Sequence, residues 1–256
     1  MTSVLTRRHL LGGLAAALCP LCLGTGRGAH AQSAHWSYEG EAGPEAWSRL
    51  DPSFRTCSIG KEQSPIDLTG AVKAELQPPA VEWRPMPLAL VNNGHTVQVN
   101  AAPGNFMRLA GERYDLLQFH FHHPSEHLIA GKRFELECHF VHRSAAGRLA
   151  VLGVMIEPGP ANAALAPIWE AMPRSEGPEL KLATMIDPRP LLPARGGLFR
   201  YPGSLTTPPC AEGVSWCVYR TPMQASAEQI QKFAQIFPLD ARPVQALGPR
   251  FVVEGG

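Results

Sequence analysis

Four histidines and a glutamate fall within the ten residues QFHFHHPSEH, residues 118–127. Side chains on a β-strand alternate between its two faces, so a strand through this stretch directs Gln118, His120 and His122 to one face. The intervening phenylalanines and His123 then face the other way. Two imidazoles on one strand face have a spacing suited to binding a single divalent metal ion such as zinc.

A third ligand has two candidates in RFELECHFVHR, a second run with the composition of a strand. His139 and His142 have opposite parity, so only one of them can share the metal-binding face. Glu137 precedes His139 by two residues, as Gln118 precedes His120, and a side-chain oxygen there can accept the outer ring N–H and fix the metal-binding tautomer. This favours His139 over His142. The predicted metal ligands are His120, His122 and His139.

The elements that must position these residues are mostly strands. Apolar or alternating runs bounded by turn residues lie at 88–91, 95–101, 106–122, 133–143, 148–157, 179–186 and 214–220. Two short helices are predicted at 162–172 and 226–237, and in the second Ser226 and Gln229 have capping-box spacing. The 25 prolines and 24 glycines are dispersed rather than gathered in a linker, so we expect a single, mainly β domain with short helices.

Residues 1–31 are predicted to be an export signal rather than part of this domain. The paired arginines of TRRHLLGG precede an alanine-rich apolar run that is too short to span a membrane, and Ala29 and Ala31 give the A-x-A pattern of a cleavage site. The arginine pair is typical of a twin-arginine signal, with an ordinary secretory signal as the alternative. We therefore expect 32–256 to be the mature domain, periplasmic or secreted, without a membrane anchor.

Charge and cysteine content limit the partners and the redox state. The net charge of the full chain is +1, and it becomes −2 without Arg7, Arg8 and Arg27, so we expect no nucleic-acid partner. Four cysteines remain in the predicted mature domain, and in an oxidising compartment they allow three complete pairings that the sequence does not distinguish. They are Cys57, Cys138, Cys210 and Cys217.

The histidine stretch resembles motifs of two metalloprotein families. His120, His122 and Glu126 fit H-x-H-x-x-x-E, the first motif of metal-binding cupins, in which two histidines and a glutamate bind a divalent ion. The Gly-Pro-Gly turn that usually precedes the last cupin histidine is missing before His139. A cupin-like metal-dependent oxygenase or isomerase, with Glu126 as a ligand, is therefore one alternative function.

Segments from residue 35 to about 245 resemble, in order, the α-class carbonic anhydrases, and bacterial exported members in particular. They are HWSYEGEAGPEAW, GKEQSPID, NNGHTVQV, QFHFHHPSEH, ELECHFVH, AVLGVMI, YPGSLTTPPCAEGVSW and ARPVQ. The resemblance implies a central, twisted, mostly antiparallel sheet with a conical zinc cavity. It further implies that a zinc-bound hydroxide, at the three histidines, attacks carbon dioxide to give bicarbonate and a proton.

The resemblance also assigns roles around the metal. Thr206 in SLTTPP matches the threonine that accepts a hydrogen bond from the hydroxide, and Glu126 matches the glutamate that accepts the threonine's own hydrogen bond. His95 in NNGH matches the proton shuttle, and Tyr38 matches a tyrosine of the water network between zinc and shuttle. Thr206 also belongs to the carbon dioxide pocket, whose other predicted residues are Val141, Val151, Leu205, Thr207, Val214 and Trp216.

Further properties of the family are expected to apply. Cys57 and Cys210 match the disulfide of exported members, which leaves Cys138 and Cys217 as buried thiols or, as the weaker alternative, a second disulfide. Sulfonamides and anions are the implied inhibitors, and a homodimer is one assembly known among bacterial members. His123 is predicted to be structural or on the surface. A non-catalytic carbonic anhydrase-related binding protein is the third function considered, and the presence of all three histidines argues against it.

Overall fold

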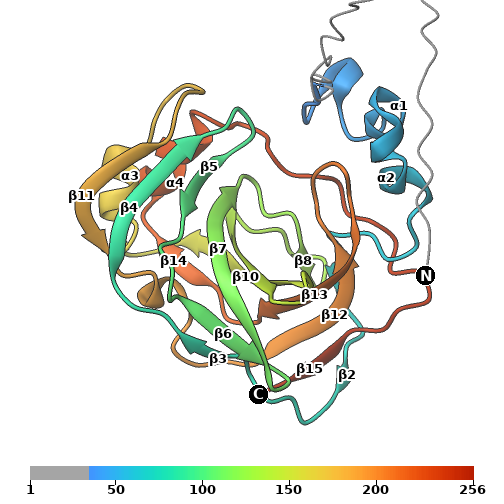
Figure 1. Ribbon diagram of the computed structural model, residues 1–256. Coiled ribbons are helices and arrows are strands. Elements are labelled where there is room, and N and C mark those ends of the chain that lie inside the picture. The colour runs from blue at the N-terminus through green and yellow to red at the C-terminus, as the bar shows by residue number, and fades with distance from the viewer. Residues whose placement is uncertain (1–34) are drawn as a thin grey trace, which may run out of the picture. The chain divides into compact units, whose positions relative to one another are not determined.

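The structure is a computed structural model that describes residues 35–256, and the predicted export signal at 1–31 lies outside the described residues. Strands dominate the described part of the chain (Figure 1). They are β1 (Asp67–Leu68), β2 (Val72–Lys73), β3 (Ala80–Glu82), β4 (Met86–Asn92), β5 (Val97–Asn100), β6 (Phe106–Leu109), β7 (Glu112–His122), β8 (Leu128–Ile129), β9 (Leu136–Ser144), β10 (Leu149–Pro158), β11 (Leu180–Ile186), β12 (Leu198–Ser204), β13 (Glu212–Tyr219), β14 (Met223–Ala225) and β15 (Val253–Gly255).

The helices are short. They are α1 (Trp47–Leu50), α2 (Thr56–Ile59), α3 (Ala166–Ala171) and α4 (Ala227–Ala234), with 3-10 turns η1 (Gly40–Ala42), η2 (Pro52–Phe54) and η3 (Arg189–Leu191). The predicted capping box of α4 is confirmed, because Gln229 N donates to Ser226 Oγ and Ser226 N donates to Gln229 Oε1, each at 3.1 Å. Within residues 35–256, no helix has the length and apolar character needed to cross a membrane.

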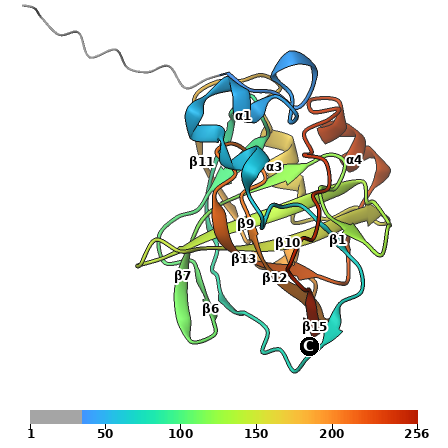
Figure 2. The same cartoon turned by 90° about the vertical axis from the view of Figure 1, so that its right-hand side faces the viewer.

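One sheet of 13 strands forms the body of the domain, and β1 pairs separately with β8. The strand order is β11-β4-β5-β7-β9-β10-β13-β12-β15-β2. The run from β11 to β10 is antiparallel throughout, whereas β10 and β13 are parallel. Figures 1 and 2 show the strong twist of the sheet. The prediction of a twisted, mostly antiparallel sheet is confirmed, and the parallel contact between β10 and β13 was not foreseen.

The strand that carries two of the histidines contains a β-bulge. Leu116, Phe119 and Phe121 are all buried in the same core, although strict alternation would place Leu116 on the face opposite the phenylalanines. The register against β9 shifts between Leu116 and Gln118, so Leu117 is an extra residue and reverses the parity of the strand. The bulge keeps apolar side chains of both halves of β7 in the core, and it leaves the other face of the second half to the histidines.

Candidate metal centre

Three histidine rings meet on one face of the neighbouring strands β7 and β9. His120 lies directly opposite His139 in the antiparallel register. The ring centroids are 4.9 Å apart for His120 and His122, 5.4 Å for His120 and His139, and 4.7 Å for His122 and His139. One nitrogen of each ring lies within 4.8 Å of the other two. The structure therefore brings together the three residues that parity selected.

Two of the three rings are held by the side chains that the sequence proposed for this purpose. His120 Nδ1 donates to Gln118 Oε1 at 2.8 Å, and His139 Nε2 donates to Glu137 Oε1 at 2.8 Å. Each acceptor takes the N–H that points away from the histidine cluster. The remaining nitrogens, His120 Nε2 and His139 Nδ1, are then free to present lone pairs to an ion.

The third ring is held by a residue that sequence reasoning missed. His122 Nδ1 donates to the backbone carbonyl of Asp240 at 2.6 Å, across 118 positions of sequence. The carboxylate of Asp240 accepts from the backbone N–H of His123 at 2.5 Å, and His123 Nδ1 donates to the carbonyl of Pro238 at 2.9 Å. His123 thus turns away from the cluster. No motif could indicate Asp240, because a backbone carbonyl can serve whatever the residue type.

His142, the rejected candidate, lies on the opposite face of β9. Its ring is buried and stacks on Trp83 with a centroid distance of 5.7 Å. Its Nδ1 donates to the carbonyl of Phe140 at 2.9 Å. Burial lowers the pKa of His142 to about 4, so the ring stays neutral at ordinary pH.

Glu137 accepts four hydrogen bonds although it is fully buried. Oε1 accepts from His139 Nε2 and from His127 Nδ1, each at 2.8 Å, and Oε2 accepts the backbone N–H groups of Glu126 and His127 at 2.9 and 2.8 Å. Burial opposes its ionisation, but the neighbouring His127 and His139 outweigh that effect and hold the pKa of Glu137 well below the usual range. His127 continues this network to the Tyr201 hydroxyl, 2.5 Å from its Nε2. The sequence assigned no role to His127 or Tyr201.

The donor set fits a zinc ion. Burial, followed by the neighbouring histidines, lowers the pKa of His120. Burial likewise lowers the pKa of His122, and the neutral imidazole is the form that binds metals. Burial also disfavours the imidazolium of His139, but Glu137 outweighs it and raises that pKa, so a metal would compete with a proton there. His122 Nε2 is buried without a hydrogen-bond partner among residues 35–256, as expected of a nitrogen that ligates an ion.

Glu126 lies beside the cluster with one oxygen fixed and one free. Oε1 accepts the backbone N–H of Arg242 at 2.8 Å. Oε2 lies 3.6 Å from His122 Nε2 and 3.8 Å from His139 Nδ1, and it has no hydrogen-bond partner in the described part of the chain. The hydrogen bond predicted from Thr206 is therefore not formed in this structure, although Thr206 is buried. The free Oε2 is the atom to which that hydrogen bond would go.

His95 and Tyr38 line one cavity of about 390 Å³. The His95 ring stacks on Trp36 at a centroid distance of 3.7 Å and an interplanar angle of 5°, and Trp36 also contacts Tyr38 edge-on at 5.3 Å. The Tyr38 hydroxyl is buried without a hydrogen-bond partner in residues 35–256. Burial, and then the charges of Glu126 and Asp240, raise the pKa of Tyr38 well above its usual value, so the hydroxyl stays protonated.

The predicted apolar pocket residues belong to one buried cluster beside the histidines. Its members include Val141, Val151, Val214 and Trp216, with Leu205 packed against them. Val151 pairs with Val141 on β9 and with Trp216 on β13, and the Trp216 ring is 4.8 Å from His139. Thr207 is half-buried in the loop between β12 and β13. The structure places these residues together, and their contact with substrate stays a prediction.

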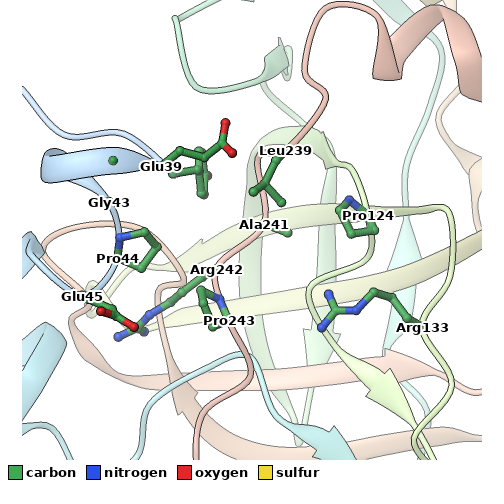
Figure 3. Close-up of a pocket in the computed structure, with 12 residues that line it drawn as sticks. Glu39, Gly43, Pro44, Glu45, Pro124, Arg133, Leu239, Ala241, Arg242 and Pro243 are labelled. Carbon is green, nitrogen blue, oxygen red and sulfur yellow. The ribbon is translucent and has the colours of Figure 1, made fainter.

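Tyr38 also lines a second cavity, of about 480 Å³, and Figure 3 shows residues that line it. Pro124, Leu239 and Pro243 give it apolar surface, and the guanidinium of Arg133 points toward it. None of the three clustered histidines lines this cavity. The conical cavity expected over the histidines stays a prediction.

The predicted disulfide is confirmed. Cys57 and Cys210 are joined, with Cα atoms 5.0 Å apart and a sequence separation of 153. The bond links α2 to the loop that carries Thr206. Cys138 and Cys217 are buried thiols, so the alternative of a second disulfide is wrong.

Comparisons with known proteins agree with this geometry. The sequence signature of the eukaryotic-type carbonic anhydrase family matches residues 42–253. The chain belongs to the carbonic anhydrase family. A carbonic anhydrase from Nostoc sp. is 44% identical over 266 residues, which cover 99% of each chain. The solved α-carbonic anhydrase from Thermovibrio ammonificans, in complex with the inhibitor sulfanilamide, has a TM-score of 0.84 at 45% identity and covers 86% of this chain and 99% of its own.

Another structural neighbour has a different ligand in its solved structure. Dioscorin complexed with ascorbate has a TM-score of 0.79 at 33% identity and covers 86% of this chain and 97% of its own. Family membership overturns the cupin alternative, in which Glu126 was a metal ligand. Relatives that are 40–44% identical over most of this chain are named carbonic anhydrase, so the enzyme class predicted from the sequence, a carbonic anhydrase, is confirmed.

Proposed function

We propose that this carbonic anhydrase interconverts carbon dioxide and bicarbonate with a zinc ion held by His120, His122 and His139. The observation that carries the proposal is the convergence of three ring nitrogens within 4.8 Å, each on a ring whose other nitrogen is already hydrogen-bonded. Three protein ligands with an open fourth position are the usual arrangement of catalytic zinc, and three imidazoles are one such ligand set. When bound, zinc supplies Lewis-acid activation of a water molecule.

Glu126 and Thr206 orient the nucleophile in this proposal. An ionised carboxylate can only accept hydrogen bonds, so the free Glu126 Oε2 makes the Thr206 hydroxyl donate to it. The Thr206 oxygen is then left as an acceptor for the nucleophile and fixes the direction of its lone pair. The bond from Arg242 N to Glu126 Oε1 supports this role, because it holds the carboxylate in place.

Substrate binding and proton removal depend on different residues in this proposal. The cluster around Val141, Val151 and Trp216 offers apolar surface for carbon dioxide and excludes water. His95 takes the released proton and passes it to buffer, since an imidazole can both accept and release a proton near neutral pH. Tyr38 stays protonated beside this path and can hold ordered water.

The cellular setting forms part of the same proposal. The mature enzyme begins near Gln32 after removal of residues 1–31, and it works in the periplasm or outside the cell, where the disulfide is stable. Sulfonamides are expected inhibitors, since the Thermovibrio relative is solved with sulfanilamide. Homodimerisation is also proposed, by analogy with bacterial members.

The test is a metal analysis together with stopped-flow carbon dioxide hydration by the purified mature protein. We expect one zinc per chain and a hydration rate above buffer that a sulfonamide abolishes. Full zinc occupancy without hydration would reject the enzymatic function and leave the non-catalytic alternative.

Glu126→Gln tests the assignment of Glu126. We expect zinc content to be retained and kcat to fall by about 10- to 100-fold, because a glutamine can present its NH₂ to Thr206 and reverse the hydrogen bond. Zinc content is measured by atomic absorption and kcat by stopped-flow. Glu75→Gln, an exposed carboxylate beside β2, is the matched control. Loss of zinc in Glu126→Gln alone would make Glu126 a ligand and contradict the assignment.

A further inference from the structure

The turn that carries His95 has a second loop packed against it. Gly177 N donates to the carbonyl of Asn92 at 3.1 Å, and Asn92 Nδ2 donates to the carbonyl of Pro173 at 3.2 Å. This loop leads from α3 to β11, and Figure 1 shows it in ochre beside the green turn between β4 and β5. The two hydrogen bonds fix the position of the loop relative to His95.

The loop places the carboxylate of Glu176 over Gly94, the residue that precedes His95. A Cβ atom at position 94 would lie only 3.0 Å from Glu176 Oε2. Gly94 also has a φ of +84°, a conformation that side chains rarely allow. The absence of a side chain at this position therefore permits the close approach of a negative charge to the shuttle turn.

His95 is surrounded by few charged groups. His35, Tyr38 and Glu39 line the same cavity as His95, and Glu176 approaches from the loop before β11. Burial is the main factor that lowers the pKa of His95, and His35 adds to it. Glu176 acts in the opposite direction. A shuttle histidine whose pKa falls too far accepts a proton poorly. The negative charge of Glu176 therefore helps His95 to accept the proton.

We propose that Glu176 is a positioning residue for proton transfer: its carboxylate stabilises the imidazolium that forms when His95 takes a proton. The inference rests on the proposed shuttle role of His95. Glu176 is exposed and touches neither the histidine cluster nor the apolar pocket residues, so its effect is electrostatic and confined to the proton-transfer step. In the proposed order of steps the proton leaves after bicarbonate, so a change in proton transfer should alter kcat and leave kcat/KM unchanged.

Glu176→Gln is the test, made on the zinc-loaded mature enzyme at low ionic strength. Removal of the negative charge destabilises the imidazolium, so the pKa of His95 in an NMR titration should fall by about 0.3. The pH profile of kcat for hydration should shift toward lower pH by the same amount, and its plateau should fall by at most about twofold. The value of kcat/KM should stay unchanged.

Two controls separate charge from structure. Glu176→Asp keeps the charge and should retain most of the wild-type profile, whereas Glu75→Gln removes a charge beside β2, at the other end of the sheet, and should change nothing. In Glu176→Gln the shift should shrink at about 0.5 M salt, since exposed charges are screened.

Three outcomes would overturn the inference. They are identical His95 titrations in wild type and Glu176→Gln, an unchanged kcat profile, and a parallel loss of kcat/KM that indicates damage to the metal site. Absence of hydration in the wild type would instead reject the proposed function. The NMR titration would still decide whether Glu176 acts on His95.

Discussion

At the residue scale, histidines of one strand differ because their surroundings differ. On β9, His139 faces an ionised carboxylate that raises its pKa, while His142, three positions later, faces apolar rings that lower its pKa to about 4. Parity and a glutamate two positions earlier were sufficient to choose between them from the sequence. The carbonyl of Asp240 could not be chosen in that way, because its contact with His122 depends on the tertiary fold alone.

His142 should make stability depend on pH in a defined window. Its pKa is about 4 in the folded state and about 6.5 in an unfolded chain, so between these values the unfolded state binds one proton more. The free energy of unfolding should therefore decrease as pH falls from 6.5 to 4, by up to about 3 kcal/mol from this residue.

Urea unfolding at several pH values measures this effect. In His142→Leu the free energy of unfolding should change less steeply with pH than in wild type. The difference in slope should correspond to about one proton fewer taken up on unfolding. His142→Gln serves as a second variant if the leucine packs poorly against Trp83. Equal slopes in wild type and both variants would show that His142 does not contribute.

At the element scale, features that depend on neighbouring residues were predicted well from the sequence, whereas the pairing of strands was not. The capping box of α4 and the strand character of β7 follow from the sequence because both depend on neighbouring residues. The predicted helix at 162–172 shortens to α3, because Asn162 Oδ1 accepts the backbone N–H of Ala164 in a turn. The predicted strand at 106–122 divides at Gly111 into β6 and β7. Neither the bulge at Leu117 nor the β10–β13 pairing has a local signature.

The disulfide should act on the loop between β12 and β13. It closes a span of 153 residues, for which chain entropy gives a stabilisation of about 5 kcal/mol as an upper value. Cys57→Ser/Cys210→Ser should lower the melting temperature, and it should lower kcat because Thr206 loses its anchor four residues away. Calorimetry and the hydration assay measure the two effects. The single variant Cys138→Ser is the control, and a double variant with wild-type kcat would show that the loop is positioned without the bond.

At the scale of the whole molecule, the two largest of the three buried clusters in the described part of the chain have different roles. The larger contains the phenylalanines of β7 together with Trp169 and Phe233 of the helices, and the smaller contains Val141, Val151 and Trp216 beside the histidines. The larger cluster supports the sheet without any contribution from a metal. We therefore expect the fold to persist without zinc, unlike small domains that need a metal to fold.

Zinc removal tests this expectation. After treatment with a chelator the protein should keep its far-UV circular dichroism and melt cooperatively, but about 10 °C lower, because free zinc at 1,000 times its Kd adds about 4 kcal/mol. Added zinc should restore the transition. His123→Ala should respond to zinc like wild type, whereas His122→Ala should not. Loss of secondary structure on chelation would contradict the expectation.

The bulge at Leu117 has a consequence for how this family can vary. It separates the histidine half of β7 from the half that pairs with β6, so the two halves have independent registers. Lengthening or shortening the β6–β7 hairpin by two residues alters only its tip, and a single-residue change can be absorbed where the strand is already irregular. Homologous chains can therefore differ in length just ahead of Gln118 and still keep their histidines in place, and alignments of this strand should allow a gap at that point.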